Sequence, residues 1–180
     1  MTDSYLRAHP NIIDLFAIAW EELPGQDDTP SVFRPLLLVE LAVDESGQSF
    51  TLDKYMARHK GSLCLKERTK ILCDIANGVA AIHALSVVHG DMKPSNVLMC
   101  QSKLQGRFVA KLSDFGFSSI ELDKRSIGLG TFLWTAPECL PEASEELKNF
   151  KNTTTRDIYS FGLIIWYAGL SAFLMDEISG

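Results

Sequence analysis

Four polar side chains in the middle of the sequence carry the clearest chemistry. Asp91, Lys93 and Asn96 share one short segment, and Asp114 begins an Asp-Phe-Gly tripeptide. A carboxylate can take the proton of an attacking hydroxyl, a lysine can stabilise a moving phosphoryl group, and asparagine and aspartate oxygens suit Mg²⁺. Phosphoryl transfer needs positioning and charge neutralisation more than covalent work by the protein. We therefore predict a phosphoryl-transfer site with Asp91 as base, Lys93 as phosphate clamp, and Asn96 and Asp114 as metal ligands.

Short strands are predicted to hold both segments. Val87 and Val88 lead directly into the first one, residues 96–99 lead out of it, and residues 108–112 deliver Asp114. Apolar and β-branched runs bounded by polar turns are typical of buried strands. We therefore expect the reactive side chains to lie at strand ends, where the backbone is held rigidly.

Residues 65–86 give the clearest helical pattern of the chain. Leu72, Ile75, Val79 and Ile82 recur at steps of three and four residues, which places them on one face of a helix. We interpret this stripe as core packing. The charged residues of the segment are expected to lie mostly off that face: Lys66, Glu67, Arg68, Lys70 and Asp74.

Two apolar runs nearer the N-terminus, residues 12–20 and 36–42, are predicted to pair as antiparallel strands. The stretch 21–35 between them holds three prolines, which favours a surface turn or loop. An acidic connector follows at 44–48, and residues 49–53 are expected to open a short helix.

Composition limits the classes of function. The 180 residues fit one domain, and a hydrophobic fraction of 46% is enough for a sizeable core. A net charge of −6 argues against nucleic acid or an anionic membrane as the main partner. The four cysteines have no metal-ligand spacing, and their scatter favours reduced thiols in a cytoplasmic protein.

One segment raises the question of a membrane. Residues 158–175 carry no charge over 18 positions, which is near the lower limit for a spanning helix. Asp176 and Glu177 follow at once, and glycines and serines interrupt the run. We favour a buried core helix over a membrane span, which stays an alternative.

Four motifs occur in the order found in the eukaryotic protein kinase family, which the sequence resembles over nearly its whole length. They correspond to the catalytic loop, the magnesium motif, the end of the activation segment and the start of the central buried helix: residues 89–96, 114–116, 136–138 and 157–162. Residues 9–13 resemble the turn into the fourth strand of the small lobe, and 38–42 resemble the hinge that holds adenine. Lys93 and the pair Gly130-Thr131 resemble the residues found in the serine/threonine branch of the family. Tyrosine specificity is a minor alternative.

The resemblance implies an α+β protein kinase-like fold. It divides the chain into a small-lobe remnant at 1–42, with the fourth and fifth strands and the hinge, and a partial large lobe at 43–180. ATP and Mg²⁺ are the implied cofactors, and a protein substrate or protein partner is implied as well. The family's glycine-rich loop, strand lysine and helix glutamate are not found before residue 9, so we expect a chain truncated at both ends.

The same resemblance assigns further roles by residue. Glu40, Ala42, Lys93 and Leu98 are expected to contact the nucleotide, and Thr131 is expected to hydrogen-bond to Asp91 and Lys93. Ser126 and Thr131 are candidate phosphorylation sites of the activation segment. The remaining matches have structural roles, with Asp157 anchoring the backbone of the catalytic loop: His89, Phe115, Gly116, Glu138 and Asp157.

The catalytic loop departs from the family at one position. Gly90 stands where the family has an arginine that reaches a phosphate on the activation segment. We therefore expect weak control by phosphorylation, or another basic group in that role, for which Lys124 and Arg125 are poor candidates. We expect low or no activity of this chain by itself. Two alternatives to a fragment of a serine/threonine kinase stay open: a catalytically impaired, kinase-like binding module, and an incomplete gene product.

Overall fold

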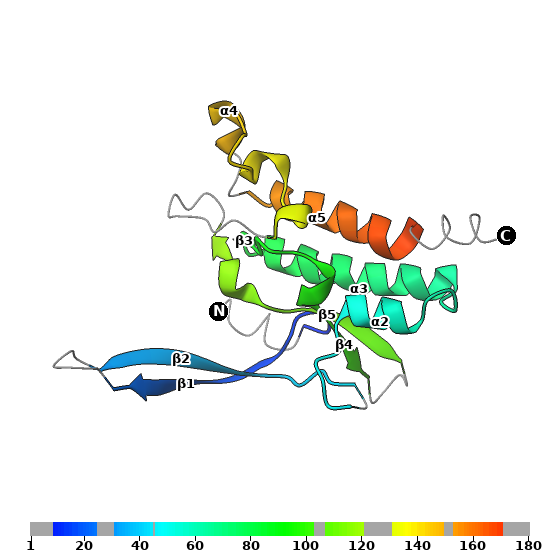
Figure 1. Ribbon diagram of the computed structural model, residues 1–180, viewed down its shortest axis with the longest axis horizontal. Coiled ribbons are helices and arrows are strands. Elements are labelled where there is room, and N and C mark those ends of the chain that lie inside the picture. Colours follow the sequence, from blue (N-terminus) through cyan, green and yellow to red (C-terminus); the bar gives the residue numbers. More distant parts are fainter. Residues whose placement is uncertain are drawn as a thin grey trace.

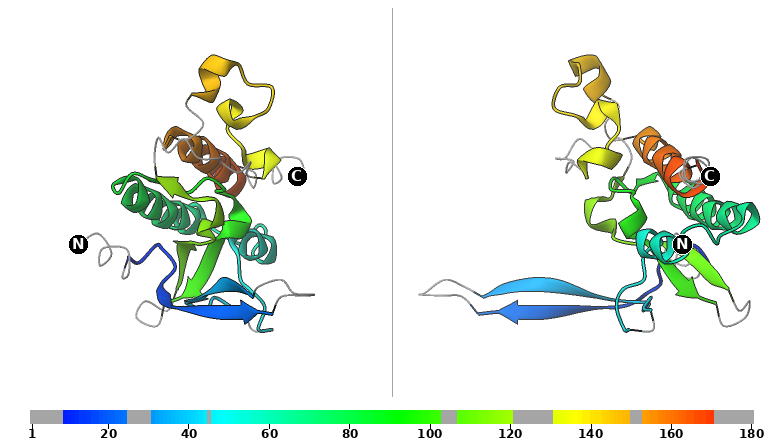
Figure 2. Two further views of the ribbon diagram at one scale, coloured as in Figure 1. Left: turned by 90° about the vertical axis from the view of Figure 1, so that its left-hand side faces the viewer. Right: turned by 45° about the vertical axis from the view of Figure 1, so that its right-hand side comes forward.

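The computed structural model describes residues 9–24, 31–44, 46–102, 107–120, 131–149 and 153–170. An antiparallel ribbon comes first and projects away from the remaining elements (Figures 1 and 2). Its strands are β1 (Leu15–Leu23) and β2 (Val32–Val39). This confirms the predicted strand pair. The predicted loop at 21–35 was too long, because β1 continues to Leu23 and β2 begins at Val32.

Pro35 shows why that loop was overestimated. It lies inside β2, opposite Trp20 of β1. In the described part of the chain β2 pairs with β1 alone, and a proline is tolerated in a strand that has an open edge. The ribbon buries little of its apolar surface, since the exposed fractions of Phe16, Trp20 and Leu37 all exceed one half at 65%, 66% and 63%.

Helices and two small sheets make up the rest of the described structure. Figure 1 shows α3 running beside α5, with α2 close to it. The helices are α2 (Leu52–Arg58), α3 (Leu65–His83), α4 (Glu145–Lys148) and α5 (Thr155–Ile165), which continues as the π-helical segment η5 (Trp166–Leu170). The short helix expected from residues 49–53 is thus α2. The central helix predicted at 158–175 begins three residues earlier than expected, and residues 171–175 lie outside the described part.

The long helix α3 carries the predicted apolar stripe. Ile75, Val79 and Ile82 are buried against the β4–β5 hairpin, and Leu72 packs at the edge of the same cluster. The helix ends at His83 rather than Ser86. Its start is fixed by the Glu67 carboxylate, which accepts a hydrogen bond of 2.9 Å from the backbone N–H of Cys64.

Two charged residues of α3 contradict the prediction that they lie off the buried face. Arg68 is buried and donates to the carbonyls of Leu63 and Ala168, at 3.1 and 2.8 Å. Asp74 is also buried, and its Oδ2 accepts from Arg107 and from the backbone N–H of Ala110. Periodicity could not show this, because each charge is buried through a partner distant in sequence.

Two short pairs of strands hold the candidate reactive segments. β4 (Val97–Gln101) pairs antiparallel with β5 (Phe108–Leu112), and β3 (Val87–Val88) pairs antiparallel with β6 (Ser119–Ile120). The predicted strands at both ends of the first segment and before Asp114 are therefore confirmed. Short 3₁₀ turns complete these regions: η1 (Pro94–Asn96), η2 (Phe115–Phe117), η3 (Phe132–Trp134) and η4 (Pro137–Cys139).

The core joins α3 to the β4–β5 hairpin. Ile75 and Ile82 of α3 are fully buried with Met99 of β4 and Leu112 of β5. Ile164 of α5 packs into the same cluster. Among the described residues, no helix is long and apolar enough to cross a membrane.

Truncating Ile75 should destabilise the fold strongly. The Ile75→Ala variant is expected to lower the free energy of unfolding by about 2–5 kcal/mol, because it opens a cavity among fully buried side chains. Urea denaturation followed by circular dichroism measures the change. Leu65→Ala on the same helix is the control and should change it by less than about 0.5 kcal/mol, since Leu65 is 62% exposed. Equal losses in the two variants would contradict this account of the core.

Candidate active site

The segment that carries Asp91 is anchored by hydrogen bonds to the carboxylate of Asp157, which lies near the start of α5. One carboxylate oxygen of Asp157 accepts from the backbone N–H of His89 at 2.8 Å, and the other accepts from the N–H of Gly90 at 2.9 Å. His83, the last residue of α3, also contacts this carboxylate at 2.9 Å. Asp157 is 1% exposed, so three partners satisfy a fully buried charge. The contacts are those expected of an anchor for this loop.

His89 connects the two reactive segments. Its Nε2 lies 3.0 Å from the carbonyl of Ser113, the residue before Asp114, so Nε2 carries the proton. Its Nδ1 accepts from the backbone N–H of Asp91 at 3.4 Å. Burial lowers the pKa of His89 despite nearby carboxylates, which agrees with a neutral ring. The ring also packs against Phe115, with centroids 4.9 Å apart.

The Asp91 carboxylate is fixed through both of its oxygens. Oδ1 accepts from the backbone N–H of Thr131 at 2.8 Å and from its hydroxyl at 3.1 Å. Oδ2 accepts from Lys93 Nζ at 2.8 Å and from the Asn96 amide at 3.0 Å. Lys93 in turn donates to the Thr131 hydroxyl at 2.7 Å. The predicted contacts of Thr131 with Asp91 and Lys93 are therefore present.

These contacts also set the charge of Asp91. Burial by itself would raise the pKa of the carboxyl, but the hydrogen bonds from Lys93 and Thr131 outweigh burial, so the pKa lies below its ordinary value. The group is ionised at neutral pH and can accept a proton.

Asn96 and Asp114 supply the oxygens that a magnesium ion would need. Both donor positions of the Asn96 amide nitrogen are committed to Asp91, to its carbonyl at 2.8 Å and its carboxylate at 3.0 Å. The amide oxygen is thus the atom of Asn96 suited to a metal. Asp114 is exposed and adopts a left-handed backbone with φ of 61°. One amide oxygen and one carboxylate fit Mg²⁺, which takes its remaining ligands from phosphate and water.

The metal donors do not form a cage made by protein alone. Within the described part of the chain, no three His, Cys, Asp or Glu side chains gather as a metal cluster.

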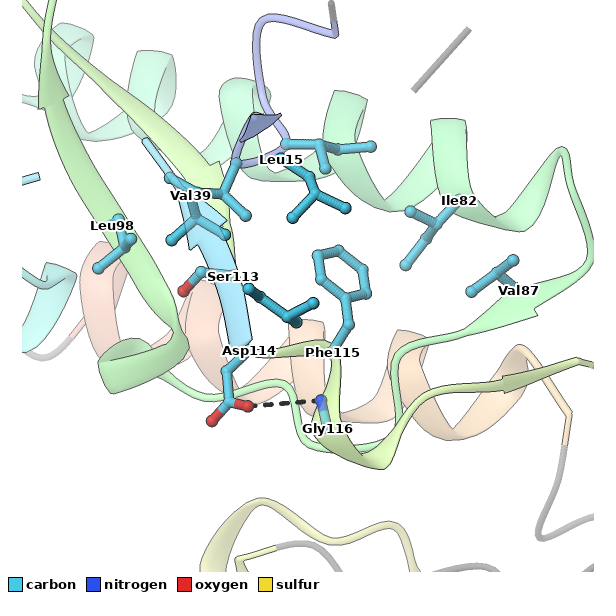
Figure 3. Close-up of a pocket in the computed structure, with 12 residues that line it drawn as sticks. Leu15, Val39, Ile82, Val87, Leu98, Ser113, Asp114, Phe115 and Gly116 are labelled. Atoms are coloured by element: carbon cyan, nitrogen blue, oxygen red, sulfur yellow. Dashed lines mark hydrogen bonds between the residues drawn. The ribbon is translucent and has the colours of Figure 1, made fainter. Parts of the chain in front are cut away.

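An apolar cavity of about 600 Å³ lies beside these groups. Figure 3 shows the Phe115 ring turned toward Ile82 and Leu15, while the Asp114 carboxylate points away from them. Leu98 lines the cavity, as do Val39 at the end of β2 and Ser113. The cavity therefore lies between the β1–β2 ribbon, where Leu15 and Val39 are, and the segment 113–116 that contains Asp114.

Three of the four predicted nucleotide contacts do not line this cavity: Glu40, Ala42 and Lys93. The Glu40 carboxylate pairs with Lys111, which also lies 3.5 Å from Asp14. Burial would lower the pKa of Lys111, but pairing with Glu40 and Asp14 outweighs burial and raises it. The side chain of Glu40 is thus committed to an ion pair.

Gly90 adopts a conformation that favours glycine. Its φ is +82°, in the left-handed region, and a Cβ built on it would lie 2.7 Å from the backbone oxygen of Phe117. Both the torsion and the close approach of η2 exclude a larger residue without rearrangement. Glycine, which departs from the family motif here, therefore fits this backbone without strain.

Comparison with known proteins decides the family. The model of the protein kinase domain matches residues 4–178, nearly the whole chain. This chain belongs to the protein kinase family. A calcium and calcium/calmodulin-dependent serine/threonine-protein kinase of Medicago truncatula is 32% identical over 160 residues, which cover 88% of this chain and 26% of that protein.

Other similar kinases match shorter stretches. The serine/threonine/tyrosine-protein kinase HT1 of Arabidopsis thaliana is 32% identical over 107 residues, covering 58% of this chain and 24% of that protein. The probable serine/threonine-protein kinase pats1 of Dictyostelium discoideum is 33% identical over 101 residues, covering 55% of this chain and 3% of that protein. The chain thus spans about a quarter or less of the length of these relatives.

Three residues of the predicted activation segment lie outside the described residues: Lys124, Arg125 and Ser126. Two other residues with predicted structural roles are described. Glu138 is half-buried in η4, and Gly116 lies in η2, where its N–H donates to Asp114.

Sequence reasoning missed two contacts around the catalytic loop. Arg156 is buried and donates to the carbonyl of Gly90 at 2.7 Å. Ser113 donates through its hydroxyl to the carbonyl of Asn96 at 2.9 Å, which ties the two kinase motifs together. In the sequence, only the position of Arg156 directly before Asp157 indicated a contact with the loop, and no family motif includes Arg156.

Adding a side chain at Gly90 should destabilise this kinase domain. Gly90→Ala is expected to lower the free energy of unfolding by about 1–3 kcal/mol, through the left-handed torsion and the contact with Phe117. Gly90→Arg should lose at least as much, although it restores the usual family residue. Thermal or urea unfolding measures both.

Gly162→Ala is the matched control for these variants. Gly162 lies inside α5, and a Cβ there would meet nothing within 4 Å. Alanine should therefore raise the free energy of unfolding by about 0.5–1 kcal/mol. A neutral Gly90→Ala variant would show that the backbone at position 90 is different from the one described.

Removing Lys93 should raise the pKa of Asp91, because burial would then act without its main opposing contact. The Lys93→Met variant, followed by NMR titration of the Asp91 carboxyl carbon, tests this. In the wild-type chain the lowered pKa adds stability that is full above the ordinary carboxyl value of about 4 and is lost as pH falls through the folded-state pKa. That contribution should shrink in Lys93→Met. Lys66→Met, at an exposed position on α3, should leave the titration unchanged.

Proposed function

We propose that this chain is part of a serine/threonine protein kinase that transfers the γ-phosphoryl group of ATP to a hydroxyl of a protein substrate. The observation that carries the proposal is the cluster of Asp91, Lys93 and Thr131, in which an ionised carboxylate and an ammonium group meet at 2.8 Å. Thr131 binds both of them.

In the proposed reaction Asp91 accepts the proton of the substrate hydroxyl. The freed oxygen attacks the γ-phosphorus of ATP, the bond from that phosphorus to the bridging oxygen of the β-phosphate breaks, and ADP leaves with the electron pair. Both carboxylate oxygens of Asp91 are held by hydrogen bonds, so the base is oriented before the substrate arrives. Lys93 lies beside the base and would offset negative charge on the phosphoryl group.

Asn96 and Asp114 are the proposed magnesium ligands. The ion would neutralise phosphate charge when bound with ATP. Asn96 supports this role because its amide nitrogen is occupied by Asp91, which leaves its oxygen for the ion.

The hinge is proposed to bind adenine through the backbone of Glu40 and Ala42. The N–H of Glu40 donates to the carbonyl of Asp14 at 2.9 Å, and the carbonyl of Ala42 accepts from Phe50 at 3.1 Å. The other backbone groups of the two residues, the Glu40 carbonyl and the Ala42 N–H, would bind adenine. Leu98, on the cavity wall, would pack against the base.

Other assignments stay proposals. We place the boundary between the small-lobe part and the large-lobe part after residue 42, between the end of β2 and the start of α2. Ser126 and Thr131 remain candidates for phosphorylation. A cytoplasmic location is favoured by the free thiols of all four cysteines.

The test compares Asp91→Asn and Asp114→Ala with the wild-type chain in a phosphorylation assay with magnesium-ATP and a general protein acceptor. Asp91→Asn should lower kcat by about 10²–10⁴-fold, because the general base is removed. Asp114→Ala should weaken binding of magnesium-ATP, measured by calorimetry. Glu142→Gln, at an exposed position after η4, is the control and should leave both quantities unchanged.

Two outcomes would count against the proposal. Activity that survives both substitutions would show that another site carries the reaction. Tight binding of magnesium-ATP without turnover in any variant would instead identify a kinase-like binding module.

A further inference from the structure

The residue before the proposed base, Gly90, is held through both of its backbone polar groups by consecutive residues of α5. The Gly90 N–H donates to Asp157 at 2.9 Å, and the Gly90 carbonyl accepts from the Arg156 guanidinium at 2.7 Å. Arg156 and Asp157 are 4% and 1% exposed, so both contacts are shielded from water. Gly90 is therefore fixed by a buried cation and a buried anion from the same helix end.

Arg156 also occupies the space beside position 90. Its guanidinium carbon lies 3.7 Å from the point where a Cβ on Gly90 would stand. The chain thus has an arginine next to the catalytic loop, although it has none at residue 90. This guanidinium belongs to a residue of α5 and contacts the backbone of the catalytic loop at the Gly90 carbonyl.

The backbone of Arg156 is itself fixed. The hydroxyl of Ser160, one helical turn later, lies 2.6 Å from the carbonyl of Trp134 and 3.0 Å from the Arg156 carbonyl, and its single proton serves these two acceptors. An arginine keeps its charge when buried, so its burial is costly unless hydrogen bonds replace water. A charged donor makes the contact with Gly90 stronger than one between neutral groups.

We propose that Arg156 is a positioning residue for Asp91. By holding the Gly90 carbonyl, it fixes the rotation of the peptide that leads into Asp91, and with it the direction of the carboxylate. This function needs no side chain on residue 90. The inference rests on the proposed kinase activity only where the rate of the reaction is concerned, since the orientation of the loop can be measured without turnover.

Arg68 provides the comparison with a merely structural arginine. It is also buried, at 5% exposed, and it also donates to backbone carbonyls, those of Leu63 and Ala168. Its contacts join the start of α3 to η5, away from the catalytic loop. Arg68→Met and Arg156→Met thus remove the same kind of interaction from two different places.

The experiment uses the full chain as wild type, Arg156→Met, Arg156→Lys and Arg68→Met. Hydrogen exchange of backbone amides should show a loss of protection at Gly90 and Asp91 in Arg156→Met, and no loss there in Arg68→Met. In the phosphorylation assay, Arg156→Met should lower kcat by about 10–100-fold with the KM for ATP unchanged, because the base is displaced while nucleotide contacts persist. Arg156→Lys should recover part of both effects, since an ammonium group can still donate to the Gly90 carbonyl.

The outcomes separate this inference from the proposed function. Unchanged protection at Gly90 in Arg156→Met would overturn the positioning role, whether or not the wild-type chain turns over. An equal fall of kcat in Arg68→Met would also overturn it, because the effect would then be general destabilisation. A wild-type chain without activity, together with lost protection at Gly90 in Arg156→Met alone, would refute the proposed reaction and support the structural part of the inference.

Discussion

The buried carboxylate of Asp157 is the contact on which the rest of the site depends. It binds the backbone of His89 and Gly90 and the side chain of His83, so it joins the start of α5 to the end of α3 and to the catalytic loop. A loop with so little regular structure has few hydrogen bonds of its own and needs partners from rigid elements. Because helices supply those partners, the geometry of the loop follows from how α3 and α5 pack.

Further contacts connect the catalytic loop, which Asp157 anchors, to the Asp114-Phe115-Gly116 motif. The neutral ring of His89 touches Ser113 and Phe115, and the Ser113 hydroxyl binds the carbonyl of Asn96. The backbone pairing of β4 with β5 also connects the two motifs, because β4 begins directly after Asn96 and β5 ends shortly before Asp114. Ser113, the neighbour of Asp114, is thus hydrogen-bonded to Asn96, which in turn binds Asp91, so the proposed metal ligand and the proposed base belong to one hydrogen-bonded network.

The sequence predicted the features that depend on local pattern or on a family motif. The stripe of α3, the short strands around both motifs and the contacts of Thr131 all follow from spacing or from the kinase resemblance. It did not predict contacts that join distant positions through a buried charge, such as those of Arg68, Asp74 and Arg156. Their burial is decided by partners up to 100 residues away, which periodicity cannot detect. The extent of β1 and β2 was also missed, because prolines are compatible with a strand that has an open edge.

The left-handed backbone of Gly90 has a consequence for how such a chain can evolve. An arginine at this position would place its Cβ 2.7 Å from the backbone oxygen of Phe117, unless the turn after the magnesium motif changed as well. The Arg156 guanidinium carbon lies 3.7 Å from the same point, which is an ordinary van der Waals contact, so the backbone of Phe117 sets the limit at residue 90.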